Sequence, residues 1–284
     1  MPDHYAVVGN PVAHSKSPLI HGEFSRQTGQ DMRYEAILAP LDGFAAAVAG
    51  FRQHGGKGLN VTVPFKLEAF KISTRLTGRA SAAQAANTLV LEEETILGDN
   101  TDGAGLVRDI TANLGFSLAG KRVLLIGAGG AARGVIVPLL EREPRILAIA
   151  NRTQEKAIDL QRQFSGFGSI LAIGYPDLQG ERFDLVINAT SASLNGELPP
   201  LPAAIFARES LAYDMMYGSG QTPFMQFAKL QGAAQLADGI GMLVEQAAES
   251  FFLWRGVRPG THTVIEMLRS RMRDALNLNP AVDR

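Results

Sequence analysis

The stretch VLLIGAGGAA, residues 123–132, decides the fold of this chain. Its four leading apolar residues predict a buried strand, and the glycine pattern G-x-G-x-x-A follows that strand directly over residues 127–132. Glycines permit a tight turn and let the backbone approach a pyrophosphate, whose oxygens can bind the N–H groups that open the following helix. The stretch therefore predicts a dinucleotide-binding strand, turn and helix rather than an ordinary glycine-rich turn.

The pattern around this stretch predicts a doubly wound parallel sheet over residues 103–238. Short apolar runs alternate there with helical or loop segments, which is typical of crossover connections between parallel strands. The runs lie at 123–126, 146–150, 170–173, 185–188, 211–214 and 235–237.

The rest of the chain predicts a second, discontinuous α/β domain, as the length of 284 residues allows. Strand patterns occur at 5–8, 34–38 and 59–63, a hairpin at 89–91 and 95–97, and helical patterns from about Leu19 and over 44–54. Helical periodicity returns over 242–254 and 264–276. We expect these final helices to cover the first domain, which then comprises residues 1–102 with 239–284.

Composition excludes several classes of protein. The 46% hydrophobic and 19% charged residues permit a full core. A net charge of −1 without a basic run argues against nucleic acid as a partner. Arg133 and glycines interrupt the apolar region 123–140, which argues against a membrane span. The absence of cysteine removes disulfides and thiolate metal sites, and it is consistent with the cytoplasm, where we expect the protein.

Two further motifs predict no ligand. Residues 115–121 spell G-x-x-x-x-G-K, but Arg122 replaces the required Ser or Thr and the motif precedes a strand. Residues 99–110 resemble a calcium loop, but Thr101 and Gly103 stand at ligand positions and Ile110 replaces the bidentate Glu. We therefore predict neither a P-loop nor a metal site.

The residues after the second strand of the parallel sheet, Asn151, Arg152 and Thr153, indicate which dinucleotide binds. Asp or Glu at about this point binds the ribose 2′-hydroxyl of NAD, and none is present. Arg152 offers a planar, bidentate donor for a 2′-phosphate. We therefore predict NADP(H). The alternative is that Thr153 only caps the next helix and Arg152 is only solvated.

Polar residues gather where strands of the first domain end, the edge at which α/β sheets bind ligands. They are Ser15, Ser17, Lys66, Asn87, Thr88, Asn100 and Asp102. Such groups suit a small polyhydroxylated ligand, with or without a carboxylate. Ser17 is equally suited to cap the helix before Pro18, as Asp102 or Thr101 is to cap the next one. Lys66 favours a functional role over a solvated one, because a cation in the first turn of a helix opposes the helix dipole.

Six stretches together resemble the shikimate dehydrogenase family, in order through nearly the whole chain. They are YAVVGNPVAHSKSP (5–18), NVTVPFK (60–66), GDNTDG (98–103), GAGGA (127–131), NRT (151–153) and DGIGMLV (238–244). The resemblance implies a discontinuous α/β substrate domain, a Rossmann-type NADP domain and an active site in the cleft between them. It also implies NADPH-dependent, reversible reduction of 3-dehydroshikimate to shikimate in aromatic amino-acid biosynthesis.

The same resemblance implies a role for each matching residue. Lys66 and Asp102 correspond to the catalytic pair. The substrate-binding positions are Ser15, Ser17, Asn60, Thr62, Asn87, Tyr217 and Gln246, and the cofactor-binding positions are Gly127, Ala128, Gly129, Gly130, Ala131, Asn151, Arg152, Thr153, Thr190, Gly239 and Met242. His14 and His21 receive no catalytic role, and we expect His21 to be a helix-surface or packed residue.

Two positions depart from the family pattern. Ala86 stands where the family usually has the larger valine, which we expect to loosen the placement of Asn87. Ser193 replaces a usual glycine, so the loop that contains it takes another path if the position needs a positive φ.

The expected chemistry leaves two rival functions open. In the expected reaction, Lys66 stabilises the developing oxyanion and donates a proton, while Asp102 orients the amine and bonds a substrate hydroxyl. The rivals are a broader quinate/shikimate dehydrogenase that uses NAD(H), and an NADP-binding regulator without turnover. Arg152 weighs against the first, and the presence of both Lys66 and Asp102 weighs against the second. We expect a monomer or a homodimer.

Overall fold

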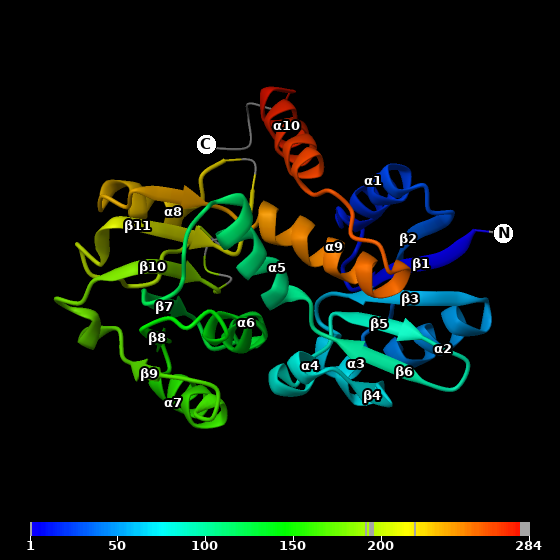
Figure 1. Ribbon diagram of the computed structural model, residues 1–284, viewed down its shortest axis with the longest axis horizontal. Coiled ribbons are helices and arrows are strands. Elements are labelled where there is room, and N and C mark those ends of the chain that lie inside the picture. The colour runs from blue at the N-terminus through cyan, green and yellow to red at the C-terminus, as the bar shows by residue number, and fades with distance from the viewer. Residues whose placement is uncertain (1, 191, 193–195, 219, 279–284) are drawn as a thin grey trace. The chain divides into compact units, whose positions relative to one another are not determined.

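The computed structural model describes residues 2–190, 192, 196–218 and 220–278, with side chains up to residue 274. The chain divides into two compact units. Unit 1 comprises Met1–Gly105 with Val244–Val264, and unit 2 comprises Leu106–Leu243 with Ile265–Arg284. Within the described residues, each unit is built on one six-stranded sheet (Figure 1).

The sheet of unit 1 has the strand order β2-β1-β3-β5-β6-β4. Strand β1 pairs in parallel with β2 and β3, whereas β5 runs antiparallel to both β3 and β6. The predicted hairpin is thus confirmed as β5 and β6. The strands are β1 (Asp3–Gly9), β2 (Met32–Leu38), β3 (Gly56–Val61), β4 (Arg75–Leu76), β5 (Thr88–Leu91) and β6 (Ile96–Asp99).

Helices cover both faces of this sheet, with α2 and α3 on one side and α1 and α9 on the other (Figure 1). On the first face, Phe44 and Val48 of α2 join a buried cluster with Leu59 of β3. On the second face, the rings of His21 and Trp254 lie 5.3 Å apart and close an aromatic layer over the sheet. The helices are α1 (Ser17–Thr28), α2 (Phe44–Gln53), α3 (Lys66–Ile72), α4 (Gly78–Ala83) and α9 (Ile240–Arg255), of which residues 244–255 belong to unit 1.

The sheet of unit 2 has the order β12-β11-β10-β7-β8-β9, and its described pairings are all parallel. Counted from β7, two strands follow on one side and three on the other, which is the doubly wound order of dinucleotide-binding sheets. The predicted fold class is therefore confirmed. The strands are β7 (Arg122–Ile126), β8 (Ile146–Ala150), β9 (Ile170–Ile173), β10 (Phe183–Asn188), β11 (Phe206–Asp214) and β12 (Gln235–Ala237).

Apolar burial explains why these strands form. The four residues of β7 from Val123 to Ile126 are 0% exposed, as expected for a central strand covered on both faces. The remaining helices are α5 (Asp102–Arg108), which continues as a π-helix over Asp109–Asn113, α6 (Gly130–Leu140), α7 (Gln154–Phe164), the 3₁₀ turn Pro176–Leu178, α8 (Pro223–Leu230) and α10 (His262–Leu278).

Local structure differs from expectation in two places. Ser17 is the first residue of α1 and does not cap it, because Lys16 takes the N-cap position without a side-chain bond. Strand β3 ends at Val61, because the chain turns just after it, with Phe65 N donating to Thr62 O. The alternating pattern of residues 59–63 therefore continues beyond the strand.

The two units also differ from the predicted domains at their boundaries. Residues 239–243 and 265–284 are expected with the first domain but group with unit 2, whereas residues 103–105 are expected with the second domain but group with unit 1. Close packing explains the first shift, because a Cβ on Gly241 would lie only 2.0 Å from Asp109 Oδ1. For the second, Arg269 of α10 lies near enough to Asp238 to oppose the rise in pKa that burial causes there. The functional assignment of each unit stays a prediction.

Two features were sought in the described residues and not found. No described helix combines the length and the apolar character that crossing a bilayer requires. The same residues contain no group of three or more His, Asp or Glu side chains arranged to hold a metal ion.

Candidate active site

Lys66 and Asp102 form an ion pair within unit 1. Lys66 Nζ lies 2.5 Å from Asp102 Oδ2. Lys66 is the first residue of α3 and Asp102 the first residue of α5, so two helix starts that follow strand ends bring the side chains together. The Lys66 side chain is 31% exposed, whereas that of Asp102 is 11% exposed. The amine can therefore meet a ligand and exchange protons with water while the carboxylate holds it.

Asn87 fixes the second oxygen of Asp102. Its Nδ2 donates to Asp102 Oδ1 at 2.8 Å and to Thr101 Oγ1 at 3.0 Å, and its Oδ1 accepts from Thr101 N at 2.8 Å. Gln246 of α9 extends the group, because its Oε1 lies 3.4 Å from both Asn87 Nδ2 and Thr101 Oγ1. The structure thus joins four predicted residues, including Lys66, in one hydrogen-bonded group.

Ser250 and Thr88 connect this group to Asn60. Ser250 Oγ accepts from Asn60 Nδ2 at 2.9 Å and lies 2.8 Å from Thr88 Oγ1. The Thr88 hydroxyl in turn donates to Asn87 Oδ1 at 2.9 Å. Sequence reasoning missed Ser250, although it follows Gln246 by four residues and so lies on the same face of α9. That spacing is the signal that could have found it.

Ser15, Ser17 and Thr62 lie where β1 and β3 end. Ser17 N donates to Ser15 Oγ at 3.3 Å, and Ser17 itself is 7% exposed. Thr62 follows β3 directly, and its backbone bond to Val8 ties the ends of β1 and β3 together. The three residues therefore share the strand-end edge of unit 1 with Asn60.

Arg79 stabilises the end of β6, which leads to Asp102. Its guanidinium donates to the two oxygens of Asp99 at 2.7 and 2.6 Å and to Glu249 Oε1 at 3.0 Å. Burial favours a higher pKa for Asp99, but Arg79 and the hydroxyl of Thr77 outweigh it, so the pKa lies below its usual value. Asp99 therefore stays ionised and anchors the backbone three residues before Asp102. Sequence reasoning missed this anchor, whose members lie far apart in the chain.

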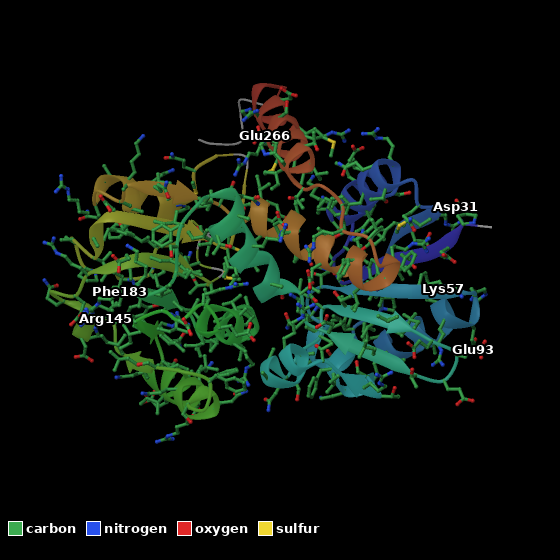
Figure 2. The ribbon with its side chains drawn as sticks, viewed as in Figure 1. Asp31, Lys57, Glu93, Arg145, Phe183 and Glu266 are labelled. Atoms are coloured by element: carbon green, nitrogen blue, oxygen red, sulfur yellow. The ribbon has the colours of Figure 1, made fainter. Side chains whose placement is uncertain are left out.

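In unit 2, the carboxyl ends of β7, β8 and β10 lie at one edge of the sheet. Gly127 N donates to Ala150 O at 2.7 Å, and Ala189 N donates to Ile126 O at 2.8 Å. Gly127 has a φ of +110°, which residues with side chains rarely adopt, and a Cβ there would lie 3.1 Å from Thr190. The opposite, amino ends of β8 and β10 are marked by Arg145 and Phe183, both labelled in Figure 2.

The glycine stretch after β7 leaves space for a ligand against the backbone. A Cβ on Gly129 or Gly130 would meet nothing within 4 Å, and both residues are exposed. Helix α6 begins at Gly130, and the first N–H groups of a helix have no partner inside it. These residues therefore fit the pyrophosphate of a dinucleotide.

Arg152 and Thr153 are exposed immediately after β8. Thr153 holds the N-cap position of α7 without a side-chain bond, so capping does not account for it. Burial raises the pKa of Tyr175, and Arg152 lies near enough to oppose part of that rise. Asn151 Nδ2 donates to Thr153 O at 2.9 Å and holds the turn. The exposed guanidinium at this strand end suits a 2′-phosphate.

Asn188 and Asp214 lock the ends of β10 and β11 together. Both are 0% exposed, and Asn188 Nδ2 donates to Asp214 Oδ1 at 3.1 Å. Thr190 donates to Asn188 Oδ1 at 2.7 Å, and Thr222 donates to Asp214 Oδ2 at 2.6 Å. The pair thus orients the predicted Thr190. Sequence reasoning missed both residues, because a buried Asn or Asp at a strand end has no local signature.

Gly239 and Met242 lie at the start of α9, in unit 2. Gly239 N donates to Met216 O at 3.1 Å, and a Cβ on Gly239 would lie 2.2 Å from Met215 O. A larger residue would therefore displace the segment that leads to Tyr217. Met242 is 8% exposed, and burial raises the pKa of Tyr217.

Three family models match this chain in order. A substrate binding domain of shikimate dehydrogenase matches residues 7–89, the shikimate / quinate 5-dehydrogenase model matches 109–195, and the C-terminal domain of shikimate 5′-dehydrogenase matches 239–276. Together they cover more than half of the chain. The chain belongs to the shikimate dehydrogenase family. The resemblance of the six sequence stretches is thereby confirmed.

Relatives in this family are similar over almost their full length. The shikimate dehydrogenase (NADP(+)) of Nitrosospira multiformis is 71% identical over 272 residues, which cover 96% of this chain and 99% of the relative. That of Nitrosomonas europaea is 62% identical, with 95% and 98% covered. The shikimate 5-dehydrogenase of Thermus thermophilus, solved in complex with NADP(H) and shikimate, has a TM-score of 0.84 and 31% identity, with 95% and 99% covered.

The two departures from the family pattern have different outcomes. Ala86 is 0% exposed and its N–H donates to Lys66 O at 2.9 Å, so it ties the chain before Asn87 to the start of α3. Asn87 is itself held through both amide atoms. The looser placement that Ala86 predicts stays a prediction. Ser193 lies outside the described residues.

Proposed function

We propose that this chain catalyses the NADPH-dependent, reversible reduction of 3-dehydroshikimate to shikimate in aromatic amino-acid biosynthesis. The Lys66–Asp102 pair carries the proposal, because a cation that a carboxylate holds and a ligand can reach suits the reduction of a ketone. Family membership supports the substrate, and the names of the relatives, shikimate dehydrogenase (NADP(+)), support the coenzyme.

In this proposal Lys66 is both the electrostatic anchor and the acid. NADPH, held at the glycine stretch of unit 2, would supply the hydride that the ketone carbon needs, and negative charge would then develop on the carbonyl oxygen. The Lys66 ammonium stabilises that charge and transfers a proton to the oxygen, so the carbonyl becomes a secondary alcohol. The amine then regains a proton from water, which its 31% exposed side chain can reach. In the oxidation direction the neutral amine accepts the proton of the alcohol.

Asp102 and Asn87 keep the Lys66 amine in one position. One Asp102 oxygen bonds the amine and the other accepts from Asn87, so the carboxylate cannot turn away. Such fixed geometry reduces the reorganisation that the reaction would otherwise require. Asp102 also has lone pairs that can accept from a substrate hydroxyl beside the ketone.

The remaining predicted residues would bind the ligands. The substrate carboxylate and hydroxyls would meet Ser15, Ser17, Thr62, Asn87, Tyr217 and Gln246. Asn60, whose amide bonds Ser250 and Thr88, would support these residues from behind. Gly127 to Ala131 would hold the pyrophosphate of NADP(H), Arg152 with Asn151 and Thr153 would hold the 2′-phosphate, and Thr190, Gly239 and Met242 would border the nicotinamide. The open backbone at Gly129 and the exposed Arg152 support this assignment.

A spectrophotometric assay tests the proposed function. We expect the purified protein to reduce NADP⁺ when shikimate is added, with a higher kcat/KM than for quinate or for NAD⁺. Comparable kcat/KM with quinate and NAD⁺ would instead show the broader dehydrogenase. Tight NADPH binding without turnover of either substrate would show the regulator.

We further propose that the enzyme works in the cytoplasm as a monomer or a homodimer. Light scattering on the eluate of a size-exclusion column measures the mass against the 30.4 kDa of one chain. A larger assembly would contradict the proposed oligomeric state.

A further inference from the structure

The amide of Asn60 is occupied on every side by protein groups. Its Oδ1 accepts from Tyr34 Oη at 2.7 Å and lies 3.1 Å from His21 Nε2. Its Nδ2 donates to Ser250 Oγ at 2.9 Å and to Thr88 Oγ1 at 3.2 Å. Asn60 is only 6% exposed. An amide with two acceptor and two donor sites in use has one orientation, which these four partners set.

His21 holds the amide as a neutral donor. Because an amide oxygen only accepts hydrogen bonds, the proton of the imidazole must be on Nε2. The ring is 0% exposed, so of the two places expected for His21, helix surface or packed interior, it takes the interior. Burial lowers the pKa of His21 to about 3, although the bond to Asn60 opposes this shift. The ring therefore stays neutral at the pH at which enzymes of metabolism work.

Tyr34 is the second donor, and the ring of His21 sets its position. The two rings stack with centroids 4.2 Å apart and planes within 6°. Burial raises the pKa of Tyr34 well above its usual value, and a hydrogen bond with Ser17 opposes only part of that rise. The hydroxyl thus keeps its proton for Asn60 and also meets the side chain of Ser17.

Tyr34 consequently stands between the two ends of the predicted substrate site. On one side it contacts Ser17, which is predicted to bind the substrate. On the other side it bonds Asn60, which continues through Thr88 to Asn87 and then to the carboxylate of Asp102.

We propose that Tyr34 is a positioning residue for the reaction: its hydroxyl orients Ser17 for the substrate and fixes Asn60, which holds Asn87 and Asp102 through Thr88, without touching the substrate itself. This proposal rests on the proposed function, because Ser17 and Asp102 are assigned to the substrate and the reaction there. Loss of the hydroxyl should weaken substrate binding, while the coenzyme site in unit 2 keeps its own contacts.

The variant Tyr34→Phe tests this, with Tyr5→Phe as the matched control. Tyr5 belongs to the same aromatic layer, 4.8 Å from the Trp254 ring, but its hydroxyl meets Arg255 at 3.3 Å. We expect Tyr34→Phe to raise the KM for shikimate about tenfold, as the loss of an orienting hydrogen bond does, and to leave the KM for NADP⁺ within about twofold. Tyr5→Phe should leave both constants unchanged. Equal KM values for shikimate in the two variants would overturn the proposal.

A double-mutant cycle separates positioning from general destabilisation. If Tyr34 acts through Ser17, the KM increase of Tyr34→Phe should shrink several-fold in a Ser17→Ala background. Increases that multiply would contradict the proposal. If Tyr34→Phe does not fold, Ser250→Ala replaces it, because Ser250 belongs to the same series of hydrogen bonds, next to Asn60. The kcat/KM of Ser250→Ala for shikimate should fall about tenfold. An unchanged kcat/KM would also overturn the proposal.

The wild-type assay distinguishes a failure of the proposed function from a failure of the role proposed for Tyr34. Absence of shikimate oxidation by the wild-type protein contradicts the proposed function itself. Wild-type activity together with a Tyr34→Phe variant that behaves like Tyr5→Phe contradicts only the role of Tyr34.

Discussion

The candidate sites of the two units are built in opposite ways. In unit 1, the polar residues are buried and interlocked: counted over the whole residue, Asn87 is 3% and Asp102 is 8% exposed. In unit 2, the residues assigned to the coenzyme are largely open, since Gly129, Gly130 and Arg152 are exposed and a Cβ on either glycine would meet no neighbour. One site is preorganised by side chains, and the other offers backbone and one exposed cation.

This difference follows from what each ligand needs. Charge that develops on a reacting oxygen is stabilised best by groups that do not reorganise, so the side chains around Lys66 must already be fixed. A pyrophosphate and a 2′-phosphate carry strong charge, so backbone N–H groups and a guanidinium suffice to hold them. Substitutions around Lys66 in unit 1 should therefore change kcat or substrate KM, whereas those in the glycine stretch and at Arg152 of unit 2 should change coenzyme KM.

The largest effect should come from Lys66→Met, which keeps much of the side-chain volume and removes the charge. We expect kcat with 3-dehydroshikimate to fall by about 10²–10⁴-fold, because general acid catalysis is lost, while the KM for NADPH stays the same. Steady-state kinetics at saturating NADPH measure this. Lys71→Met, an exposed position of the same helix, is the control and should keep wild-type kcat. A near-normal kcat for Lys66→Met would contradict the view that the side chains of unit 1 carry the reaction while those of unit 2 bind the coenzyme.

Arg152→Asp should have the next largest effect, on the choice of coenzyme. The ratio of kcat/KM for NADPH to that for NADH should fall by roughly 10–100-fold, since a charge-assisted bond to the 2′-phosphate is replaced by repulsion. The exposed Arg162, also after β8, provides the control Arg162→Asp. An unchanged ratio for Arg152→Asp would show that the 2′-phosphate binds elsewhere.

A smaller effect is expected from Gly129→Ala. The position has an ordinary φ of −85° and open space, so the melting temperature should not fall. The added methyl group would instead keep the pyrophosphate from the backbone, which should raise the KM for NADP⁺ about tenfold. Gly127→Ala should show the opposite behaviour. Its φ of +110° is strained for any residue with a side chain, so this variant should lose about 1–3 kcal/mol of stability. A coenzyme KM unaffected by Gly129→Ala would argue against this site.

The last effect leaves activity aside: it concerns stability at low pH and sharpens the description of unit 1. The pKa of His21 is about 3 in the folded chain, below its ordinary 6.5, because burial favours the neutral ring. The unfolded chain therefore binds the proton more readily below pH 6.5, so the stabilisation is complete above that pH and declines as the pH falls toward 3. At pH 5 the loss relative to pH 7 is about 2 kcal/mol.

Urea unfolding of His21→Gln at pH 7 and pH 5 measures this contribution. The variant should lose about 2 kcal/mol less stability than the wild type over that interval. The exposed His262 supplies the control His262→Gln, which should follow the wild type. If His21→Gln also follows the wild type, His21 does not remain neutral in the fold.

The sequence predicted unit 2 more closely than unit 1. Strand β8, Ile146–Ala150, has the predicted bounds, because a central parallel strand is one continuous apolar run. Unit 1 contains short elements that no periodicity reveals, such as the two residues of β4 and the six of α4. The end of β3 is set by the turn in which Phe65 N donates to Thr62 O, and the alternation of residues 59–63 does not reveal that turn.

The candidate site shows the same division between local and distant information. Lys66 could be singled out from its place in a first helical turn, and the family motifs supplied Asp102. The connections between them could not be predicted, because Ser250 meets Thr88 across 162 positions of sequence and Tyr34 has no feature that sets it apart from a core tyrosine. Hydrogen bonds between distant strands and helices depend on the packed fold rather than on spacing.

The central claim is that Lys66 and Asp102 act as one catalytic unit. The most direct test is the kcat of the double variant Lys66→Met/Asp102→Asn beside both single variants, at saturating NADPH and 3-dehydroshikimate. We predict that the double variant loses no more than about threefold beyond the Lys66→Met variant, because Asp102 acts through the amine that is already absent. A loss equal to the product of the two single losses would contradict the claim and show that the residues act independently.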